Sequence, residues 1–441
     1  MKTTAFLLVW LAFPSGFSQI HFVDKKADGE NPGVTSLRGA FTVGVSPGGK
    51  HLYAPGSLDH GLSVFSKDSF SGALTFVEAH VDGQGGITSL AGCRAAAVSP
   101  DGKHVYAAAL TDGAVTVFSR NPTTGALTFV QAIFDLDTGG TIDGLGGAMA
   151  IAISPDGEHV YVGARSDDAI AAFTRDPGTG TLTLINVYKN LTPPILGLDG
   201  VEGLAMSGDG MHLYASAETD QAVTAFSRNP TTGALTFIDS YFDGAGGIDG
   251  LGCVNNLSVS PDGEHVYAVG QFGAPSQPSC PVGFDDWMAI FARDTATGAL
   301  SFLASLSPTD FNLPINCGGV AGDNGVVVSP NGEAVYATVQ WQAAVVALRR
   351  NPANGMLTLD GFDCADLLDP DAVTDLISAH GLTTDPMGYR ILVSALSPGT
   401  VIVYETGAYR EFRFETSTWP IQVQVAGLVQ RINDLSGIQP P

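Results

Sequence analysis

A repeated unit of close to 53 residues is the feature of this sequence that most restricts its fold. The motif Ser-Pro-x-Gly, or a close variant of it, occurs seven times. The seven anchors begin at Ser46, Ser99, Ser154, Ser207, Ser260, Ser329 and Asp385, with spacings of 53, 55, 53, 53, 69 and 56 residues. A fixed period of this length indicates one large repeat domain rather than the two or three domains that 441 residues would otherwise suggest.

Each unit is predicted to form four β-strands. The stretch 98–131, "VSPDGKHVYAAALTDGAVTVFSRNPTTGALTFVQ", has short apolar runs broken by Pro-Asp-Gly, Thr-Asp-Gly and Asn-Pro-Thr-Thr-Gly. The 55 glycines and 25 prolines of the chain fit many tight turns. Because four-stranded units must pack against their neighbours and protect their edges, we predict an all-β fold, a seven-bladed β-propeller.

The N-terminal strand is predicted to close the ring. Residues 20–29, "IHFVDKKADG", align with 74–83, "LTFVEAHVDG", which is a fourth strand and its linker. Residues 20–25 would therefore complete a seventh blade whose other strands lie near 377–384, 389–395 and 400–405. Residues 409–415, "YREFRFE", could fill the same place.

The two ends of the chain are expected to lie outside this propeller, which covers 19–406. Residues 1–18 have one lysine, an apolar run and small residues before a cleavage point, as in a signal peptide. Their apolar run is too short to span a bilayer, so we expect a secreted protein without a transmembrane segment. The tail 407–441 matches no blade, alternates at Ile421–Val425 and then has helical spacing from Val425 to Leu435. It is either a packed tail or an interaction segment.

The charge of the chain limits its partners. The formal net charge is −24, from 44 acidic and 20 basic residues. Such a surface repels nucleic acid and anionic lipid and suits cations or basic partners.

The repeated segments resemble a known family. "VSPDGKHVY", "AVTVFSRNPTTGALTFV" and the linker "DGLGG" are similar to the lactonase-like β-propellers, the family of 6-phosphogluconolactonase and the carboxymuconate-lactonizing enzymes. The resemblance runs from about residue 20 to 406. It implies the propeller fold and a hydrolase acting on a lactone or sugar acid, but the matching segments are blade scaffold, and fold alone does not carry chemistry over.

Residues that differ between the units are better candidates for function than those that repeat. Five histidines share one position before the second strand and are predicted to be structural: His51, His104, His159, His212 and His265. The residue five before each anchor, at the start of the inner strand, instead varies: Phe41, Arg94, Met149, Glu202, Asn255, Asn324 and His380. These positions should surround the mouth of the central channel, a plausible ligand site.

The resemblance implies Arg, Glu and His in this central cleft, and Arg94, Glu202 and His380 match by repeat position. Lactone opening needs a base, which could be His380 or Glu202, and a cation such as Arg94 to hold a carboxylate or oxyanion. Asn255, Asn324, His60 and Trp287 are predicted to help bind the ligand, the last from the enlarged loop 271–287. The alternative is that Arg94 and Glu202 form a salt bridge and that His380 is an ordinary hydrogen-bonded residue.

Acidic loops on the same face could bind calcium, although no cofactor is required. Asp112, Asp168 and Asp220 are the candidate ligands, because calcium takes six to eight oxygen ligands. The competing interpretation is that these aspartates only build turns.

Five cysteines in an exported protein suggest disulfides. Because linkers and enlarged loops share a face, we expect Cys253–Cys280 and, second, Cys317–Cys364, with Cys93 left free beside Arg94.

Two functions remain open from the sequence. The first is an exported lactonase acting on a lactone or sugar acid at the channel mouth. The second is a non-catalytic secreted or cell-surface propeller that binds a protein, a glycan or calcium through its acidic loops. The oligomeric state does not follow from the sequence.

Overall fold

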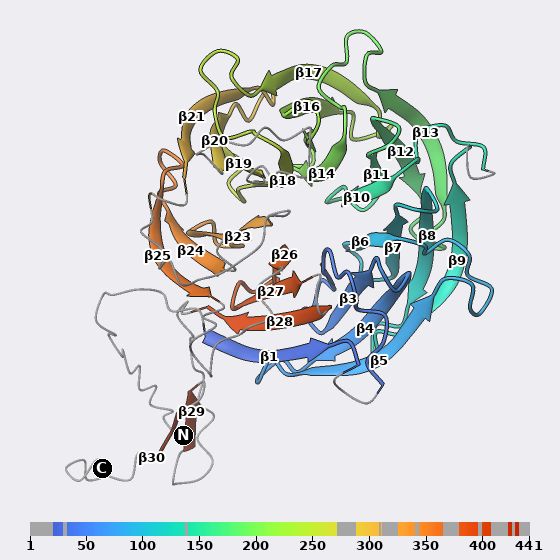
Figure 1. Cartoon of the computed structure of the whole chain (residues 1–441), viewed down its shortest axis with the longest axis vertical. Helices are drawn as coiled ribbons and strands as arrows, with labels where there is room; N and C mark the ends of the chain where they lie inside the picture. Colours follow the sequence, from blue (N-terminus) through green and yellow to red (C-terminus); the bar gives the residue numbers. More distant parts are fainter. Residues whose placement is uncertain are drawn as a thin grey trace, which may run out of the picture.

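The computed structural model shows a ring of β-sheets around a central axis (Figure 1). It describes residues 21–29, 33–136, 140–270, 288–307, 310, 325–339, 344–364, 379–395, 399–406, 422–425 and 428–431. Seven four-stranded antiparallel sheets form the ring, so the predicted all-β, seven-bladed β-propeller is confirmed. We number the blades in the order of their anchor motifs.

In every blade the strands run from the channel to the rim. Blades 1 and 2 contain β2 (Gly44–Val45), β3 (His51–Gly56), β4 (Gly61–Lys67) and β5 (Leu74–Val81), then β6 (Cys93–Val98), β7 (His104–Ala109), β8 (Ala114–Arg120) and β9 (Leu127–Phe134). Blades 3 and 4 contain β10 (Ala148–Ile153), β11 (His159–Ala164), β12 (Ala169–Arg175) and β13 (Leu182–Lys189), then β14 (Val201–Met206), β15 (His212–Ala217), β16 (Ala222–Arg228) and β17 (Leu235–Phe242). Blades 5 and 6 contain β18 (Val254–Val259), β19 (His265–Gly270), β20 (Met288–Arg293) and β21 (Leu300–Leu306), then β22 (Val326–Val328), β23 (Ala334–Val339), β24 (Ala344–Arg350) and β25 (Leu357–Cys364).

Blade 7 combines the two ends of the propeller. It contains β26 (Ala379–Thr384), β27 (Arg390–Ala395), β28 (Thr400–Glu405) and, at its rim, β1 (His21–Ala27). Strand β1 pairs antiparallel with β28, from His21 opposite Glu405 to Ala27 opposite Thr400. The predicted closure by the N-terminal strand is therefore confirmed, whereas the competing segment 409–415 lies outside the described residues.

The anchor motif forms the turn between the first two strands of a blade. In blade 2, Oγ of Ser99 accepts a hydrogen bond from the backbone N–H of His104 at 3.0 Å and donates one to Asp101 at 2.6 Å. Gly102 has a φ of 70°, a conformation that glycine adopts without strain. The repeat is thus explained by turn chemistry, with Ser, Asp and Gly each at the position where the turn needs it.

The hydrophobic core lies between the blades. Seven apolar clusters fill the seven junctions, and the second strand of each blade is almost wholly buried. In blade 2, for example, Tyr106 and Val115 pack with Val160 and Val162 of blade 3. Since each blade needs both neighbours to bury its faces, the ring must form as a whole.

Five arginines link neighbouring blades. Arg175 of blade 3 reaches into blade 2, where its guanidinium donates to Nδ1 of His104 at 2.8 Å, to the hydroxyl of Tyr106 at 2.8 Å and to Asp101 at 2.8 Å. Arginine has no acceptor, so each histidine bonded in this way must keep Nδ1 unprotonated. The same arginine–histidine contact joins Arg120 to His51, Arg228 to His159, Arg293 to His212 and Arg350 to His265. The predicted structural role of the five histidines is confirmed.

The two junctions of blade 7 use other residues. Thr406 occupies the arginine position next to blade 6, and its hydroxyl donates to the carbonyl of Gly388 at 2.9 Å. Lys67 occupies it next to blade 1 and pairs with Asp385 at 3.3 Å. Burial lowers the pKa of Lys67, although Asp385 opposes that change.

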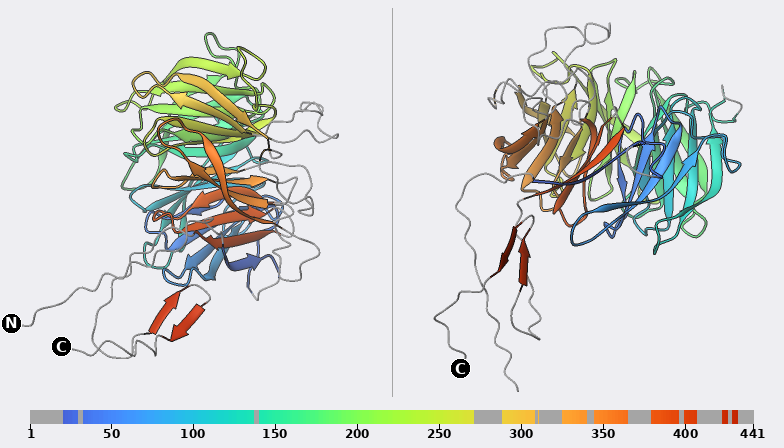
Figure 2. Two further views of the ribbon diagram at one scale, coloured as in Figure 1. Left: turned by 90° about the vertical axis from the view of Figure 1, so that its left-hand side faces the viewer. Right: turned by 60° about the horizontal axis from the view of Figure 1, so that its bottom comes forward.

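Part of the tail forms a separate hairpin. Strands β29 (Gln422–Val425) and β30 (Leu428–Arg431) pair with each other and lie outside the ring (Figures 1 and 2). The strand expected from the alternation near 421–425 is confirmed over 422–425, but the helix expected from Val425 onward is wrong over 428–431. A short run with leucine and valine is ambiguous between helix and strand, and here the pairing with β29 decides.

No helix long and apolar enough to cross a membrane occurs among the residues that the structure describes.

Candidate functional site

A β-bulge at one common position shapes the mouth of the channel. In five inner strands the pairing register shifts where the variable residue stands: Arg94 in β6, Met149 in β10, Glu202 in β14, Asn255 in β18 and His380 in β26. A bulged residue leaves the regular alternation, and its side chain is re-aimed. The inner strands surround the centre of the ring (Figure 1). The five bulged residues stand near the first residue of their strands, so they lie at the same end of the ring.

Arg94 and His380 meet at the ring of Phe41. The guanidinium carbon of Arg94 lies 4.2 Å from the centroid of the Phe41 ring, in a cation–π contact. The His380 ring lies 4.6 Å from the same ring, centroid to centroid. Phe41 therefore brings together two predicted catalytic residues from blades 2 and 7.

Two further contacts fix this side of the mouth. Nη1 of Arg94 lies 4.0 Å from the sulfur of Met149, and the hydroxyl of Thr42 donates to the carbonyl of Arg94 at 3.0 Å. The carbonyl of His380 accepts from the buried hydroxyl of Thr338 at 3.2 Å. Both bulged residues are thus held by hydrogen bonds of their own backbone to the neighbouring blade.

Glu202 lies in an ionic cluster on blade 4. Nε of Arg165 is 3.1 Å from Oε1 of Glu202, and another nitrogen of the same guanidinium pairs with Glu218. The side chains of Glu202 and Glu218 are 4% and 1% exposed, and that of Arg165 is 35% exposed. Glu202 thus forms an ion pair with Arg165, a partner that the sequence analysis did not consider.

Arg165 and Glu218 were not predicted. Both stand eleven residues after an anchor serine, directly behind the second strand, where units 1 and 2 have Ser57 and Leu110. The residue eleven positions after the anchor therefore differs between the units, like the residue five positions before it. This variation is the sequence signal that points to Arg165 and Glu218.

Asn255 lies next in the ring, on β18. Its side chain is buried, and within the described part of the chain neither its amide nitrogen nor its oxygen has a hydrogen-bond partner. A buried carboxamide without partners costs free energy, about 1–3 kcal/mol for each unmet group. Asn324 and Trp287, the other predicted binding residues here, lie outside the described residues.

His60 holds the linker of the next blade. It has a φ of 55°, and its Nδ1 accepts from the backbone N–H of Gly92 at 2.9 Å. This hydrogen bond shows that His60 stabilises the linker. A role of His60 in ligand binding stays a prediction.

The three predicted calcium ligands also accept hydrogen bonds from linkers. Asp112 accepts from the backbone N–H of Ala91 at 2.7 Å, Asp168 from Gly200 at 2.9 Å and Asp220 from Asp199 at 2.8 Å. They lie on three different blades. Burial, and to a smaller extent Asp82, raises the pKa of Asp112 despite its hydrogen bond from Ala91. The three aspartates therefore stabilise the linkers by accepting backbone hydrogen bonds. Calcium binding at these loops stays a prediction.

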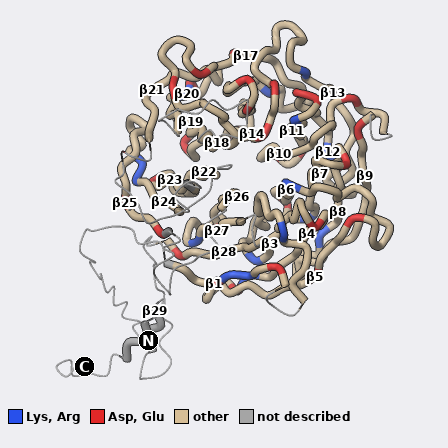
Figure 3. The backbone as a smooth tube through the Cα atoms, in the orientation of Figure 1, with Lys and Arg blue, Asp and Glu red and all other residues tan. Residues whose placement is uncertain are grey.

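The acidic residues are spread around the ring rather than gathered on one blade (Figure 3). Four aspartates pair with the arginines between the blades, namely Asp101, Asp156, Asp209 and Asp262. The hydrogen bond from Arg175 and other donors outweigh burial and lower the pKa of Asp101 to about 2. These acids belong to the ring scaffold.

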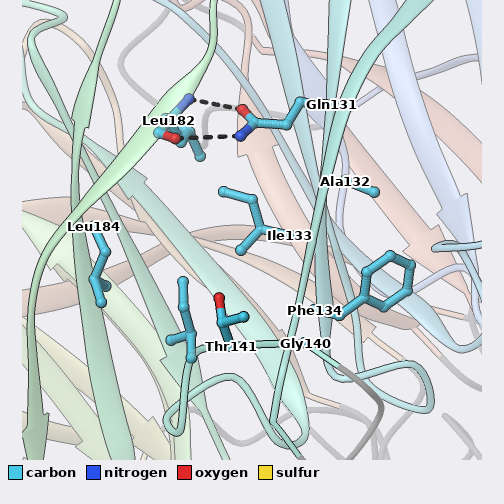
Figure 4. A pocket seen from close by; sticks show the side chains of 9 residues that line it. Gln131, Ala132, Ile133, Phe134, Gly140, Thr141, Leu182 and Leu184 are labelled. Carbon is cyan, nitrogen blue, oxygen red and sulfur yellow. Dashed lines mark hydrogen bonds between the residues drawn. The ribbon is translucent and has the colours of Figure 1, made fainter.

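An open hollow of about 460 Å³ lies on the rim, between β9 and β13. Figure 4 shows Gln131 turned towards Leu182, with which it exchanges two hydrogen bonds: it donates to the carbonyl at 3.3 Å and accepts from the N–H at 2.8 Å. Because both strands are the outermost of their blades, this hollow is separate from the mouth. Gln131 joins two blades there.

The cysteines agree with the prediction as far as they are described. Cys93 is free and fully buried, and burial raises the pKa of its thiol, which makes it inert. Cys253 is buried in the turn before β18, with a φ of 53°. Cys280 and Cys317 lie outside the described residues, so both disulfides stay predictions.

The fold is a seven-bladed β-propeller in which residues that differ between the units share one bulged position of the inner strands. The profile of the family described as "Lactonase, 7-bladed beta-propeller" matches residues 16–143, 87–255 and 203–366. The chain belongs to this family.

Two curated relatives share short stretches with the chain. A 6-phosphogluconolactonase of Photorhabdus laumondii is 31% identical over 96 residues, which are 22% of this chain and 27% of that protein. A 6-phosphogluconolactonase of Bacillus subtilis is 29% identical over 152 residues, which are 34% of this chain and 41% of that protein. The alignments thus span less than half of either relative.

A solved structure is similar over most of the ring. The periplasmic gluconolactonase of Pseudomonas aeruginosa superimposes with a TM-score of 0.56 at 18% identity, covering 78% of this chain and 94% of that one. At this identity the likeness shows the shared fold.

Proposed function

We propose that this protein is an exported lactonase that hydrolyses a sugar-type lactone at the mouth of its channel. One observation carries the proposal: Arg94, Glu202 and His380 occupy the same bulged position in three inner strands, and Arg94 and His380 contact the same ring of Phe41. Membership of the lactonase family supports the reaction class.

The reaction assigns one task each to His380 and Arg94, which meet at Phe41 on one side of the mouth. His380 takes a proton from water as the water oxygen attacks the lactone carbonyl carbon. Arg94 stabilises the negative charge that develops on the carbonyl oxygen, a task for a fixed cation in a partly buried site. The ring C–O bond then breaks, the proton returns from His380 to the leaving oxygen, and the product is a hydroxy acid.

Glu202 and Asn255 lie on the other side and suit the hydroxyl groups of a sugar. A carboxylate accepts hydrogen bonds, and a carboxamide both donates and accepts. The names of the two relatives suggest a phosphorylated substrate, but the net charge of −24 opposes the approach of a phosphate. We therefore favour a neutral aldonolactone, in line with the name of the periplasmic gluconolactonase of similar fold.

The test is proton release from glucono-1,5-lactone and from an acyl lactone, measured against the spontaneous rate. Arg94→Met and His380→Gln are each expected to lower kcat/KM by about 100-fold or more, as losses of a charge-stabilising group and of a general base do. Arg349→Met, which removes an exposed arginine of β24 at a distance from the inner strands, is the control and should retain activity. If folded wild-type protein turns over neither lactone, the catalytic proposal fails, and the acidic loops become the candidate surface for a protein or glycan partner.

Calcium and export are tested separately. The same assay and a melting curve with EDTA and with added Ca²⁺ examine the loops of Asp112, Asp168 and Asp220. Expression of the full chain, followed by N-terminal sequencing of the protein outside the cytoplasm, is expected to find Gln19 as the first residue. Intact protein retained in the cytoplasm would contradict export.

A further inference from the structure

Arg165 joins two buried carboxylates at one edge of blade 4, where the start of β14 pairs with the end of β15. Glu202 stands in the bulge of β14, and Glu218 follows β15. Arg165 comes from blade 3, directly after β11, and its backbone N–H donates to the carbonyl of Gly147 at 3.0 Å. Its guanidinium uses Nε for Glu202 and a terminal nitrogen for Glu218.

The geometry of the guanidinium explains what this contact does. The group is planar and rigid, so two carboxylates bound through different nitrogens fix its orientation and are themselves fixed by it. A carboxylate as buried as Glu202 is costly to keep ionised without a cation beside it. Arg165 therefore places a positive charge beside Glu202 and fixes the orientation of its carboxylate.

This cluster differs from the cation on the other side of the mouth. Arg94 lies over the face of Phe41, with its guanidinium carbon 4.2 Å from the centroid of the ring. Arg165 instead directs two of its nitrogens at protein carboxylates. The two arginines thus have different tasks, although both stand at the mouth.

We propose that Arg165 is a positioning residue that fixes Glu202 as the acceptor for a substrate hydroxyl and so leaves His380 as the base. A carboxylate whose charge is balanced by an arginine is a weak proton acceptor but a good hydrogen-bond acceptor. Glu218 is the second anchor, since it fixes the far side of the same guanidinium. The inference rests on the proposed lactonase activity and names the group that selects a hydroxylated substrate.

Kinetics of Arg165→Met test the assignment. With glucono-1,5-lactone the variant should raise KM about 10-fold or more, the size expected for loss of a hydrogen bond to a charged group, with little change in kcat. With an acyl lactone that has no ring hydroxyls, KM should hardly change. The acid limb of the pH profile of kcat should stay where it is, because it reports His380. Arg165→Lys should recover part of the loss.

The control is Arg349→Met, which removes an exposed arginine of β24 that pairs with Asp360 of β25. This variant should change neither kcat nor KM. A fall in kcat with a displaced acid limb would overturn the proposal, because Glu202 would then be the base. Unchanged kinetics on both lactones would overturn it as well.

A stability measurement separates this proposal from the proposed function. In Arg165→Met the buried carboxylate of Glu202 loses the cation beside it, which favours its protonated form. The protein should then keep its stability where this carboxylate is protonated and lose stability as rising pH ionises it. The denaturant midpoint of Arg165→Met should therefore fall more at pH 8 than at pH 5, and Glu202→Gln in the same chain should restore part of it at pH 8. If no lactone is turned over but this pattern is found, the activity fails and the positioning of Glu202 stands. An equal loss at both pH values would overturn the positioning itself.

Discussion

The guanidinium of Arg175 donates to Nδ1 of His104 across the junction between blades 3 and 2, at 2.8 Å. The same guanidinium also binds Asp101, the hydroxyl of Tyr106 and the carbonyl of Gly157. Arg175 therefore donates hydrogen bonds to four groups that belong to two blades. Its side chain is buried, with 1% exposed.

Arg175→Met should accordingly be strongly destabilising. Breaking a buried charged network leaves its partners unmet, and we expect a loss of about 3 kcal/mol in the free energy of unfolding. Urea unfolding followed by fluorescence measures it. The matched variant Arg349→Met removes an exposed ion pair and should cost about 0.5 kcal/mol or less. Equal losses in the two variants would contradict the role of the arginines between blades.

The five structural histidines should make the ring sensitive to acid. Burial first, and then the adjacent arginine, lowers the pKa of His104 in the folded state, and the same two causes act on His51, His159, His212 and His265. In the unfolded chain these groups return to a pKa of about 6.5. The stability they contribute is complete above that pH and is lost as pH falls from about 6.5 towards the lowered folded values.

Unfolding free energies between pH 8 and pH 5 test this expectation. Three carboxyl groups act in the opposite direction, since burial raises the pKa of Asp112, Asp167 and Asp199. A variant is therefore needed to isolate the histidines: His104→Gln should show a shallower dependence on pH below 6.5 than the wild type. An unchanged slope would show that His104 becomes protonated in the folded ring.

Blade 7 should be the first part of the ring to open. At its junction with blade 6, Thr406 stands where five other junctions have arginine. Its junction with blade 1 keeps charged links, since Lys67 pairs with Asp385 and Arg390 donates to carbonyls at positions 69 and 70. The weak junction is therefore the one with blade 6. Fewer charged links across a junction lower the free energy of local opening. Amide hydrogen exchange of β27 and β28 should therefore be faster than that of β11 and β12, which occupy the same positions in blade 3. Equal protection of the two blades would contradict this expectation. Because His380 stands on β26, such opening would also disturb its contact with Phe41.

The predicted disulfide Cys253–Cys280 has a direct test. Peptide mapping of the exported protein without reduction should find these two cysteines in one linked pair and Cys93 alkylated only after unfolding, because its thiol is fully buried. Alkylation of Cys253 in the native, unreduced protein would exclude the pair.

The repeat explains how much could be predicted from the sequence. A fixed period sets the position of every strand, so comparing units placed Arg94, Glu202 and His380 at one level of the channel without any catalytic motif. It could not show which side chains meet. The contacts of Phe41 with Arg94 and His380 depend on how each blade is rotated relative to the next. The same holds for the ion pair between Arg165 and Glu202. The loop residues His60 and Asp112 accept from backbone N–H groups of linkers, and a sequence does not reveal which donors a carboxylate faces.

Asn255 offers a test of whether the mouth is built for binding at the expense of stability. Its buried carboxamide has no partner within the described residues, which is unfavourable for the free ring. Asn255→Leu has a similar volume and removes the unmet groups, so it should stabilise the protein by about 1 kcal/mol or more. If the carboxamide serves a sugar hydroxyl, the same change should raise KM for glucono-1,5-lactone and leave that for an acyl lactone unaltered. Asn255→Asp, which keeps the size but buries a charge, should lower stability. A stabilised Asn255→Leu with wild-type kinetics on both lactones would show that this side chain takes no part in recognition, and the selection of hydroxylated substrates would then be assigned to Glu202 with Arg165 rather than to Asn255.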